Sequence, residues 1–304
     1  MNSTIVIDAS SVPNPNQTSQ PEPTSRASLQ RRNGEPRPRL TFGGVVRSER
    51  IKLTSLRGVR ITMLVSVVAG LGLSLLMAWM MSSSNAGGVD EVFGTGDEAL
   101  QSYLLMISTF SASFLSLVFG VLGVFAVASE YSSGMILSTL TAVPKRMPVA
   151  LAKTLVLSTL ALLAAVIVVG GGLGIAAAFA PKALGQIGST VVISGALGTV
   201  AYLVIFALFA MGVAGMLRSS AGAIAVVTGV AFVLPVGFQV LTMTGWAWVY
   251  DVMNVLPSSL GSILSQGTLE GSVVGFWPAL ALMAAWAAAT LIPAAIVFVW
   301  RDAK

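Results

Sequence analysis

Six long runs of apolar residues that contain no Asp, Glu, Lys or Arg constrain this chain more than any other feature of its sequence. A helix rises about 1.5 Å per residue, so about 20 apolar residues are needed to cross the hydrocarbon core of a bilayer. The runs are continuous, whereas the strands of a membrane barrel alternate apolar and polar residues. The sequence therefore predicts an all-α membrane protein with six transmembrane helices, over residues 61–81, 103–128, 155–180, 191–217, 221–244 and 277–300.

The basic residues between the runs predict the orientation of the chain. The positive-inside rule assigns the short connections rich in Lys and Arg to the cytoplasm. With the N-terminus in the cytoplasm, 16 of the 17 Lys and Arg residues lie on that side, and Lys182 alone lies outside. We therefore expect a multi-pass protein with both termini in the cytoplasm.

Two different segments precede the first predicted span. Residues 1–39 combine six Pro residues with many Ser, Asn, Gln and Thr, a composition typical of a disordered cytoplasmic tail. The Arg residues of this tail either enforce the topology or bind anionic lipid head groups. In residues 40–58, apolar residues recur at helical spacing with Arg between them, which predicts an amphipathic helix in the membrane interface. An irregular linker is the alternative.

Two connections between the predicted spans are unusual. Residues 129–154, between the second and third spans, are long for a bundle connection, and Glu130 is the only acid among them. Residues 245–276, before the sixth span, contain too many Trp, Leu and Ile residues for a solvated loop. We expect short helices there that dip into the outer leaflet. By contrast, only Arg218, Ser219 and Ser220 separate the fourth and fifth spans, which predicts a tight antiparallel hairpin.

The composition removes most kinds of catalytic and metal chemistry. The chain has no Cys and no His, so thiolate nucleophiles, imidazole bases and Cys/His metal sites are excluded. No ionisable residue lies in the predicted spans, which argues against a proton-driven carrier. No phosphate-binding loop of the Walker type occurs. The glycines at 70–72 and 170–174 lie in spans, where they predict close helix packing, with a hinge as the alternative. We expect no enzyme activity, bound cofactor or metal in this chain and no nucleic-acid partner.

Three features resemble the membrane subunits of ABC exporters of the type-2 permease family, whose architecture is shared with the G-type ABC exporters. The segment 48–57, SERIKLTSLR, is similar to the family's lead-in to the first span. The segment 129–134, SEYSSG, resembles the family pattern E-Y-x-S-G-T, with Met135 in place of the Thr, and Pro144-Lys145-Arg146 follows it. The third feature is the layout of six spans with an apolar last outer loop. The resemblance covers residues 40–304, which would form one six-helix permease domain.

The resemblance implies roles for two sets of residues. The amphipathic stretch would be the connecting helix, and the loop around Glu130 would hold a coupling helix that docks on a separate ATP-binding subunit, where ATP and Mg²⁺ would bind. An acid at this position can also pair with Lys or Arg of a partner subunit or of the connecting helix. A solvated carboxylate is the alternative. The implied coupling residues are Glu130, Tyr131, Ser133, Gly134, Pro144 and Arg146, and those of the connecting helix are Glu49, Arg50, Lys52 and Arg57.

The family layout also implies a translocation path lined by the second and fifth spans of two membrane subunits, identical or different. On the second span Phe110 and Phe114 are four residues apart and share a helix face with aromatic character, as a hydrophobic or amphipathic cargo would require. Ordinary packing is the alternative. The implied path residues are Phe110, Phe114, Phe125, Pro235 and Gln239, with Pro235 expected to kink the fifth span.

The function expected from the sequence is thus that of the transmembrane subunit of an ATP-driven exporter in a bacterial plasma membrane. Two other classes stay open. One is a membrane anchor or signalling partner that recruits cytoplasmic proteins without transport. The other is an ATP-independent carrier, because sodium coupling through backbone carbonyls needs no ionisable side chain.

Overall fold

The computed structural model describes residues 41–82, 93–94, 96–132, 146–268 and 274–300, all of which belong to one compact unit, Thr41–Lys304. The predicted tail, 1–39, lies outside the described residues. Within them all the regular structure is helical. Six helices are long and apolar enough to cross a membrane, which confirms the six predicted spans and a multi-pass membrane protein. These spans are Arg57–Ser82, Asp97–Tyr131, Met147–Phe179, Thr190–Leu217, Ser220–Thr244 and Phe276–Phe298.

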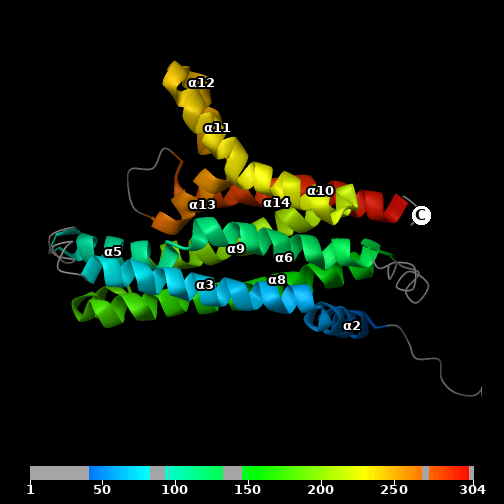
Figure 1. The fold of residues 1–304 in the computed structure, drawn as a ribbon, viewed down its shortest axis with the longest axis horizontal. Helices are drawn as coiled ribbons and strands as arrows, with labels where there is room; N and C mark the ends of the chain where they lie inside the picture. The colour runs from blue at the N-terminus through cyan, green and yellow to red at the C-terminus, as the bar shows by residue number, and fades with distance from the viewer. Residues whose placement is uncertain (1–40, 83–92, 95, 133–145, 269–273, 301–304) are drawn as a thin grey trace, which may run out of the picture. The chain divides into compact units, whose positions relative to one another are not determined.

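The elements follow one another along the chain as Figure 1 labels them. Those of the first half are α2 (Phe42–Ser55), α3 (Arg57–Ser82), α5 (Asp97–Thr109), α6 (Ala112–Ser132), α8 (Arg146–Phe179) and the 3-10 turn η3 (Pro181–Gln186). Those of the second half are α9 (Thr190–Leu217), α10 (Ser220–Thr228), η4 (Gly229–Val233), α11 (Leu234–Leu241), η5 (Thr242–Thr244), α12 (Ala247–Asn254), α13 (Pro257–Gln266) and α14 (Phe276–Trp300).

The helices around the predicted coupling loop are longer than the apolar runs. The second span continues through Ser132 in α6, and the third begins at Arg146 in α8, nine residues before the predicted start at 155. Much of the predicted loop 129–154 is therefore helix. The spans also include charged residues that the apolar runs place outside them, among them Glu130 and Lys153. Both residues lie within helices, Glu130 in α6 and Lys153 in α8, and their side chains form a buried ion pair.

The second span is interrupted near its middle, which its unbroken apolar sequence does not predict. Helix α5 ends at Thr109 and α6 begins at Ala112. The hydroxyls of Ser108 and Thr109 both donate to the carbonyl oxygen of Leu105, at 3.3 and 2.7 Å. Such bonds from Ser and Thr to the preceding turn compete with the backbone ladder and bend helices, so this polar pair accounts for the break.

Helix α9 is the central helix of the bundle. It packs against α5, α6, α8, α10, α13 and α14, and it is apolar around its whole circumference, as a buried helix is. Close approach depends on small residues at its contacts. A Cβ atom built on Gly198 would overlap the carbonyl of Leu264 in α13, and one on Gly212 would overlap Thr290 in α14. Gly123 of α6 meets α9 in the same way, at the carbonyl of Ala207.

The glycines predicted to serve packing do so in part. A Cβ atom on Gly70 of α3 would meet Val168 of α8 at 2.6 Å, and one on Gly172 of α8 would meet the Ser108 backbone of α5 at 2.8 Å. Gly171 similarly faces Leu71. By contrast, Gly72, Gly170 and Gly174 have open space where a Cβ atom would lie, so close packing requires glycine at only half of these six positions.

The fifth span contains a π-helical segment before Pro235. The N–H of Leu234 donates to the carbonyl of Gly229, five residues back, and Pro235 then opens α11. Proline has no N–H, and its ring collides with the preceding turn of an α-helix; the wider π turn accommodates both effects. Figure 1 shows the bend between α10 and α11, after which α11 leaves the side of α9. None of the residues of α11 is buried.

Two short helices, α12 and α13, lie in the described part of the segment 245–276. Helix α13 packs on α9 and α14, and the ring of Tyr202 in α9 covers Gly261 so closely that a side chain there would overlap it. Helix α12 is anchored by Trp286, whose indole N–H donates to the carbonyl of Val255 at 2.9 Å. The aromatic rings of Trp246, Trp248 and Tyr250 are exposed.

Candidate functional site

Helix α2 attaches to the bundle through one face. The hydroxyl of Thr41 caps its N-terminus by accepting from the N–H of Gly44 at 3.2 Å. The buried residues Val45, Glu49 and Leu53 are spaced by four and so form one stripe. Val45 packs against Val149 and Ala152 of α8, so α2 lies against the beginning of the third span. An acid, Glu49, thus occupies the middle of an otherwise apolar contact.

Four charged side chains meet at this contact and form what we call the charge ring: Glu49 and Lys52 of α2, Glu130 of α6 and Lys153 of α8. The Nζ atom of Lys153 lies 2.8 Å from Oε2 of Glu49 and 2.7 Å from Oε1 of Glu130. The Nζ atom of Lys52 lies 2.8 Å from Oε1 of Glu49 and 3.4 Å from Oε1 of Glu130. Each acid therefore contacts both lysines, and each lysine contacts both acids.

Three of the four side chains in the charge ring are removed from solvent. The side chain of Glu49 is 2% exposed and those of Glu130 and Lys153 are each 8% exposed, whereas that of Lys52 is 26% exposed. Burying a charge costs several kcal/mol unless it is paired and hydrogen-bonded. Because the ring has two charges of each sign in alternation, every charge is compensated, and no member can be removed without leaving an excess charge.

The lysines control the titration of Glu49, and the acids control that of Lys52. Burial raises the pKa of the Glu49 carboxyl. The combined effect of Lys153 and Lys52 lowers it by more, so the net pKa lies below the usual value. Burial lowers the pKa of Lys52, but its hydrogen bond to Glu49 and the charge of Glu130 raise it above the usual value. Both shifts favour the charged forms over the whole neutral range.

We expect α2 to detach in acid. A depressed carboxyl pKa gives stability that is present above the ordinary Glu pKa of about 4.3 and is lost as the pH falls through the lower, folded pKa. The backbone amides of α2 should therefore lose protection from hydrogen exchange below about pH 4, close to the ordinary Glu pKa, after correction for the intrinsic exchange rate. Helix α9 serves as the internal reference at each pH. Unchanged protection of α2 down to pH 3 would contradict this prediction. The raised pKa of Lys52 acts in the opposite direction, because its contribution is lost only as the pH rises through its folded pKa.

Tyr131, beside Glu130, contacts the hairpin between α9 and α10. The guanidinium carbon of Arg218 lies 5.5 Å from the centre of the Tyr131 ring. Arg218 ends α9 in the left-handed conformation, with φ 52°, and Ser219 then caps α10 by accepting from the N–H of Gly222. The predicted tight hairpin is thus confirmed, and its Arg stacks on the last turn of α6, a contact of about 0.5–1 kcal/mol where exposed.

The other predicted coupling and connecting-helix residues have different positions. Arg146 is the first residue of α8, and Arg57 is the first residue of α3 rather than part of the connecting helix. Arg50 is exposed on α2. The remaining three, Ser133, Gly134 and Pro144, lie outside the described residues.

The predicted path residues lie in two separate regions. Phe110 sits at the break between α5 and α6, and its ring centre is 6.4 Å from that of Phe114; both side chains are exposed. Phe125 is half-buried and packs over Gly58 of α3. Pro235 and the exposed Gln239 lie on α11, which contacts mainly its sequence neighbours η4, η5 and α12. Among the described residues, the main contacts of α11 do not include α5 or α6, the helices next to which the aromatic pair lies.

Two residues of this region were not predicted as parts of a site. The apolar runs predict a loop at Lys153, yet its side chain is buried in the charge ring. The sequence did contain a signal for this pairing. A buried Glu130 requires a cation, and Lys153 is the only Lys or Arg in the apolar residues 147–181. The sequence indicates Arg218 only as part of the hairpin and does not predict its contact with Tyr131.

A scan against models of protein families finds no match to this chain, and a search of curated proteins finds none either. The resemblance to exporter membrane subunits therefore rests on the residues quoted above.

Proposed function

We propose that this chain is the transmembrane subunit of an ATP-driven exporter of the type-2 ABC class. In this proposal it lies in a bacterial plasma membrane with both termini in the cytoplasm. A second membrane subunit, a copy of this chain or a related one, completes the path for a hydrophobic or amphipathic substrate. ATP and Mg²⁺ bind to a separate subunit, which docks on the segment 133–145.

The observation that carries this proposal is the charge ring. It joins the helix before the first span to both helices that flank the segment 133–145: Glu130 lies three residues before that segment, and Lys153 lies eight residues after it. A force applied to the segment would reach α6, α8 and α2 together, because the buried ion pairs couple them. A solvated carboxylate at Glu130 would transmit nothing, and its side chain is 8% exposed.

The fifth span supports the role of a second membrane subunit. Most of α11 and the aromatic residues after it are exposed, and the whole span Ser220–Thr244 is the least buried of the six. In the proposed assembly this span faces the path and the second subunit, which brings Gln239 toward the cargo. Helix α2 would lie in the cytoplasmic interface, with Arg47 and Arg50 toward the head groups, and α12 and α13 would dip into the outer leaflet.

Purification of the tagged chain from its native membranes in mild detergent tests the proposal. We expect an ATP-binding subunit in stoichiometric amount and ATP hydrolysis that vanadate inhibits. The subunit composition also distinguishes two copies of this chain from two different membrane subunits. Isolation of the chain without any ATPase from several detergents would contradict the proposal and favour the anchor or the ATP-independent carrier.

The role of Glu130 in coupling has a matched control in the same span. Glu130→Gln removes the charge at one end of the second span, and Glu98→Gln removes an exposed charge at the other end. With transport normalised to folded protein, we expect ATP-driven transport to fall strongly in Glu130→Gln and to stay at the native rate in Glu98→Gln. Native transport in Glu130→Gln would refute the coupling role while leaving the transporter class intact.

A further inference from the structure

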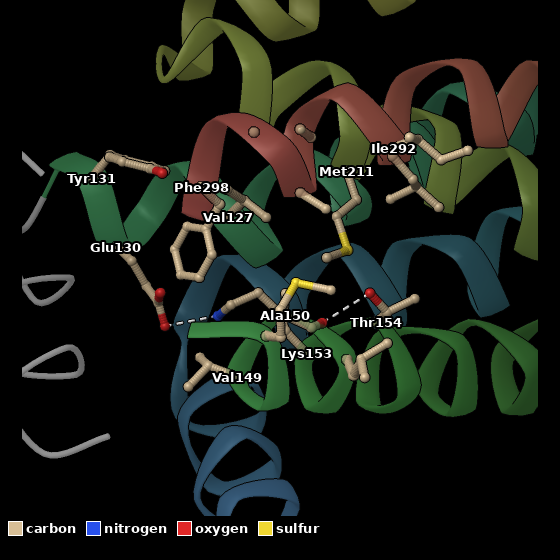
Figure 2. Close-up of a pocket in the computed structure, with 16 residues that line it drawn as sticks. Val127, Glu130, Tyr131, Val149, Ala150, Lys153, Thr154, Met211, Ile292 and Phe298 are labelled. Atoms are coloured by element: carbon tan, nitrogen blue, oxygen red, sulfur yellow. Dashed lines mark hydrogen bonds and ion pairs between the residues drawn. The ribbon is translucent and has the colours of Figure 1, made fainter. Parts of the chain in front are cut away.

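A cavity of about 280 Å³ lies beside the charge ring, enclosed by α6, α8, α9 and α14. Figure 2 shows its lining: Glu130 and Lys153 at one end, Met211 of α9 and Ile292 of α14 at the other, and Phe298 of α14 near Glu130. No step of the proposed coupling uses this space. None of the predicted path residues lines it, whereas two of the predicted coupling residues, Glu130 and Tyr131, do.

The cavity exists because α14 packs closely against α9 but only loosely against α8. A Cβ atom on Gly212 would overlap Thr290, and one on Gly215 would meet the Cβ atom of Ala294 at 3.0 Å, so α9 and α14 are in close contact on this side. The facing positions on α8 and α14 carry the small residues Ala150 and Ala295. These side chains are too short to fill the space between the two helices.

The mouth of the cavity opens toward lipid. Met147 and Leu151 of α8 and Ile292 of α14 line it, and their side chains are 48%, 57% and 60% exposed. All three belong to helices long and apolar enough to cross a membrane. In a bilayer, exposed apolar side chains on membrane-crossing helices contact acyl chains rather than water, so the molecules that reach the mouth would be those of the bilayer.

The lining is charged at one end and mostly apolar beyond it, so it matches an amphiphile that lies along the bilayer normal. The charged groups of the lining lie at the end where α6 finishes and α8 begins. The rest of the lining is apolar apart from Tyr131 and Thr154, whose hydroxyl donates to the carbonyl of Ala150. Oε1 of Glu130 accepts from both lysines. Among the described residues Oε2 accepts no hydrogen bond, and Figure 2 shows it on the side of Phe298. A lipid whose head group carries a hydrogen-bond donor could enter at this end and donate to Oε2 of Glu130.

We infer that this cavity binds one acyl chain of a membrane phospholipid whose head group carries a hydrogen-bond donor, such as the primary ammonium of an ethanolamine lipid. The volume is slightly below the usual range of small-molecule pockets, about 300–1,000 Å³, so it takes a single chain and leaves the second chain in the bilayer. The ammonium or hydroxyl group lies at Oε2 of Glu130, and the chain runs between α8 and α14 toward the membrane centre. This inference does not depend on transport.

The test uses the full chain in vesicles of phosphatidylcholine that contain a small fraction of a photoreactive lipid, with a diazirine on one acyl chain. The probe is phosphatidylethanolamine in one experiment and phosphatidylcholine, whose quaternary head group donates no N–H bond, in the other. After irradiation, labelled peptides are identified by mass spectrometry. We expect phosphatidylethanolamine to label the peptides of α8 and α14 that line the cavity, and phosphatidylcholine to label them several-fold less.

Two alanines of α14 give the matched variants. Ala295→Phe fills the cavity, whereas Ala285→Phe adds the same ring at an exposed position outside it. Labelling of the lining peptides should drop several-fold in Ala295→Phe and stay unchanged in Ala285→Phe; Ala150→Phe fills the cavity from α8 and repeats the test if Ala295→Phe does not fold. Equal labelling in both α14 variants would overturn the site, and equal labelling by the two lipids would overturn the head-group assignment.

Discussion

Replacing Lys153 by Met is expected to lower the free energy of unfolding by about 3–5 kcal/mol, the range found when one partner of a buried ion pair is removed. Met has nearly the same length and fills the same space, so the loss reports charge rather than volume. Glu49 and Glu130 would then share Lys52 alone, which lies 2.8 and 3.4 Å from them, and the ring would carry a net negative charge. Unfolding by sodium dodecyl sulfate in mixed micelles measures the change.

Two further variants separate the charge ring from general effects of the substitution. Lys182→Met removes a lysine exposed on η3 and is expected to change stability by less than about 0.5 kcal/mol, as surface substitutions usually do. The double variant Lys153→Met, Glu49→Gln removes one charge of each sign and leaves the pair Lys52–Glu130. It should recover part of the loss, because contacting residues are not additive. A double variant as unstable as the sum of the two single ones would contradict the ring as a coupled unit.

The parts of the fold that depend on length and hydropathy could be predicted from the sequence. All six spans, the hairpin at Arg218 and the short helices of 245–276 occur where the apolar runs and their interruptions indicate. The ends of the spans could not be predicted this way. An apolar run ends at its first charged residue, whereas a helix ends where backbone hydrogen bonding ends, and buried pairing allowed α6 to include Glu130 and α8 to include Lys153.

The pairing itself depends on tertiary structure that the sequence does not display. That Glu130 requires a cation follows from its position, and a lysine of the connecting helix was among the predicted partners; Lys52 fills that role at 3.4 Å. The shorter contact is with Lys153, at 2.7 Å, and it arises only because α6 and α8 lie side by side at this end. The same limit applies to α9, whose central position depends on which faces of six other helices meet it.

A second large effect is expected at the crossing of α6 and α9, from the smallest possible substitution. Gly123→Ala adds one methyl group, and its Cβ atom would overlap the carbonyl oxygen of Ala207 and approach the backbone nitrogen of Met211 at 3.1 Å. Backbone atoms cannot rotate aside as a side chain can, so the two helices must separate. We expect a loss of about 1–3 kcal/mol, the usual cost of overpacking, although alanine is the better helix former.

Gly170→Ala is the matched control for this crossing and should have the opposite sign. Gly170 lies within α8 and has open space at the Cβ position, so the substitution keeps only the gain in helix propensity, up to about 1 kcal/mol. The two variants are compared by the same unfolding assay in mixed micelles. If Gly123→Ala proved as stable as Gly170→Ala, α6 and α9 would not be in backbone contact at Gly123. The charge ring depends on that contact as well, because α6 carries Glu130 and its distance from α8 is set by the helix that both of them pack against.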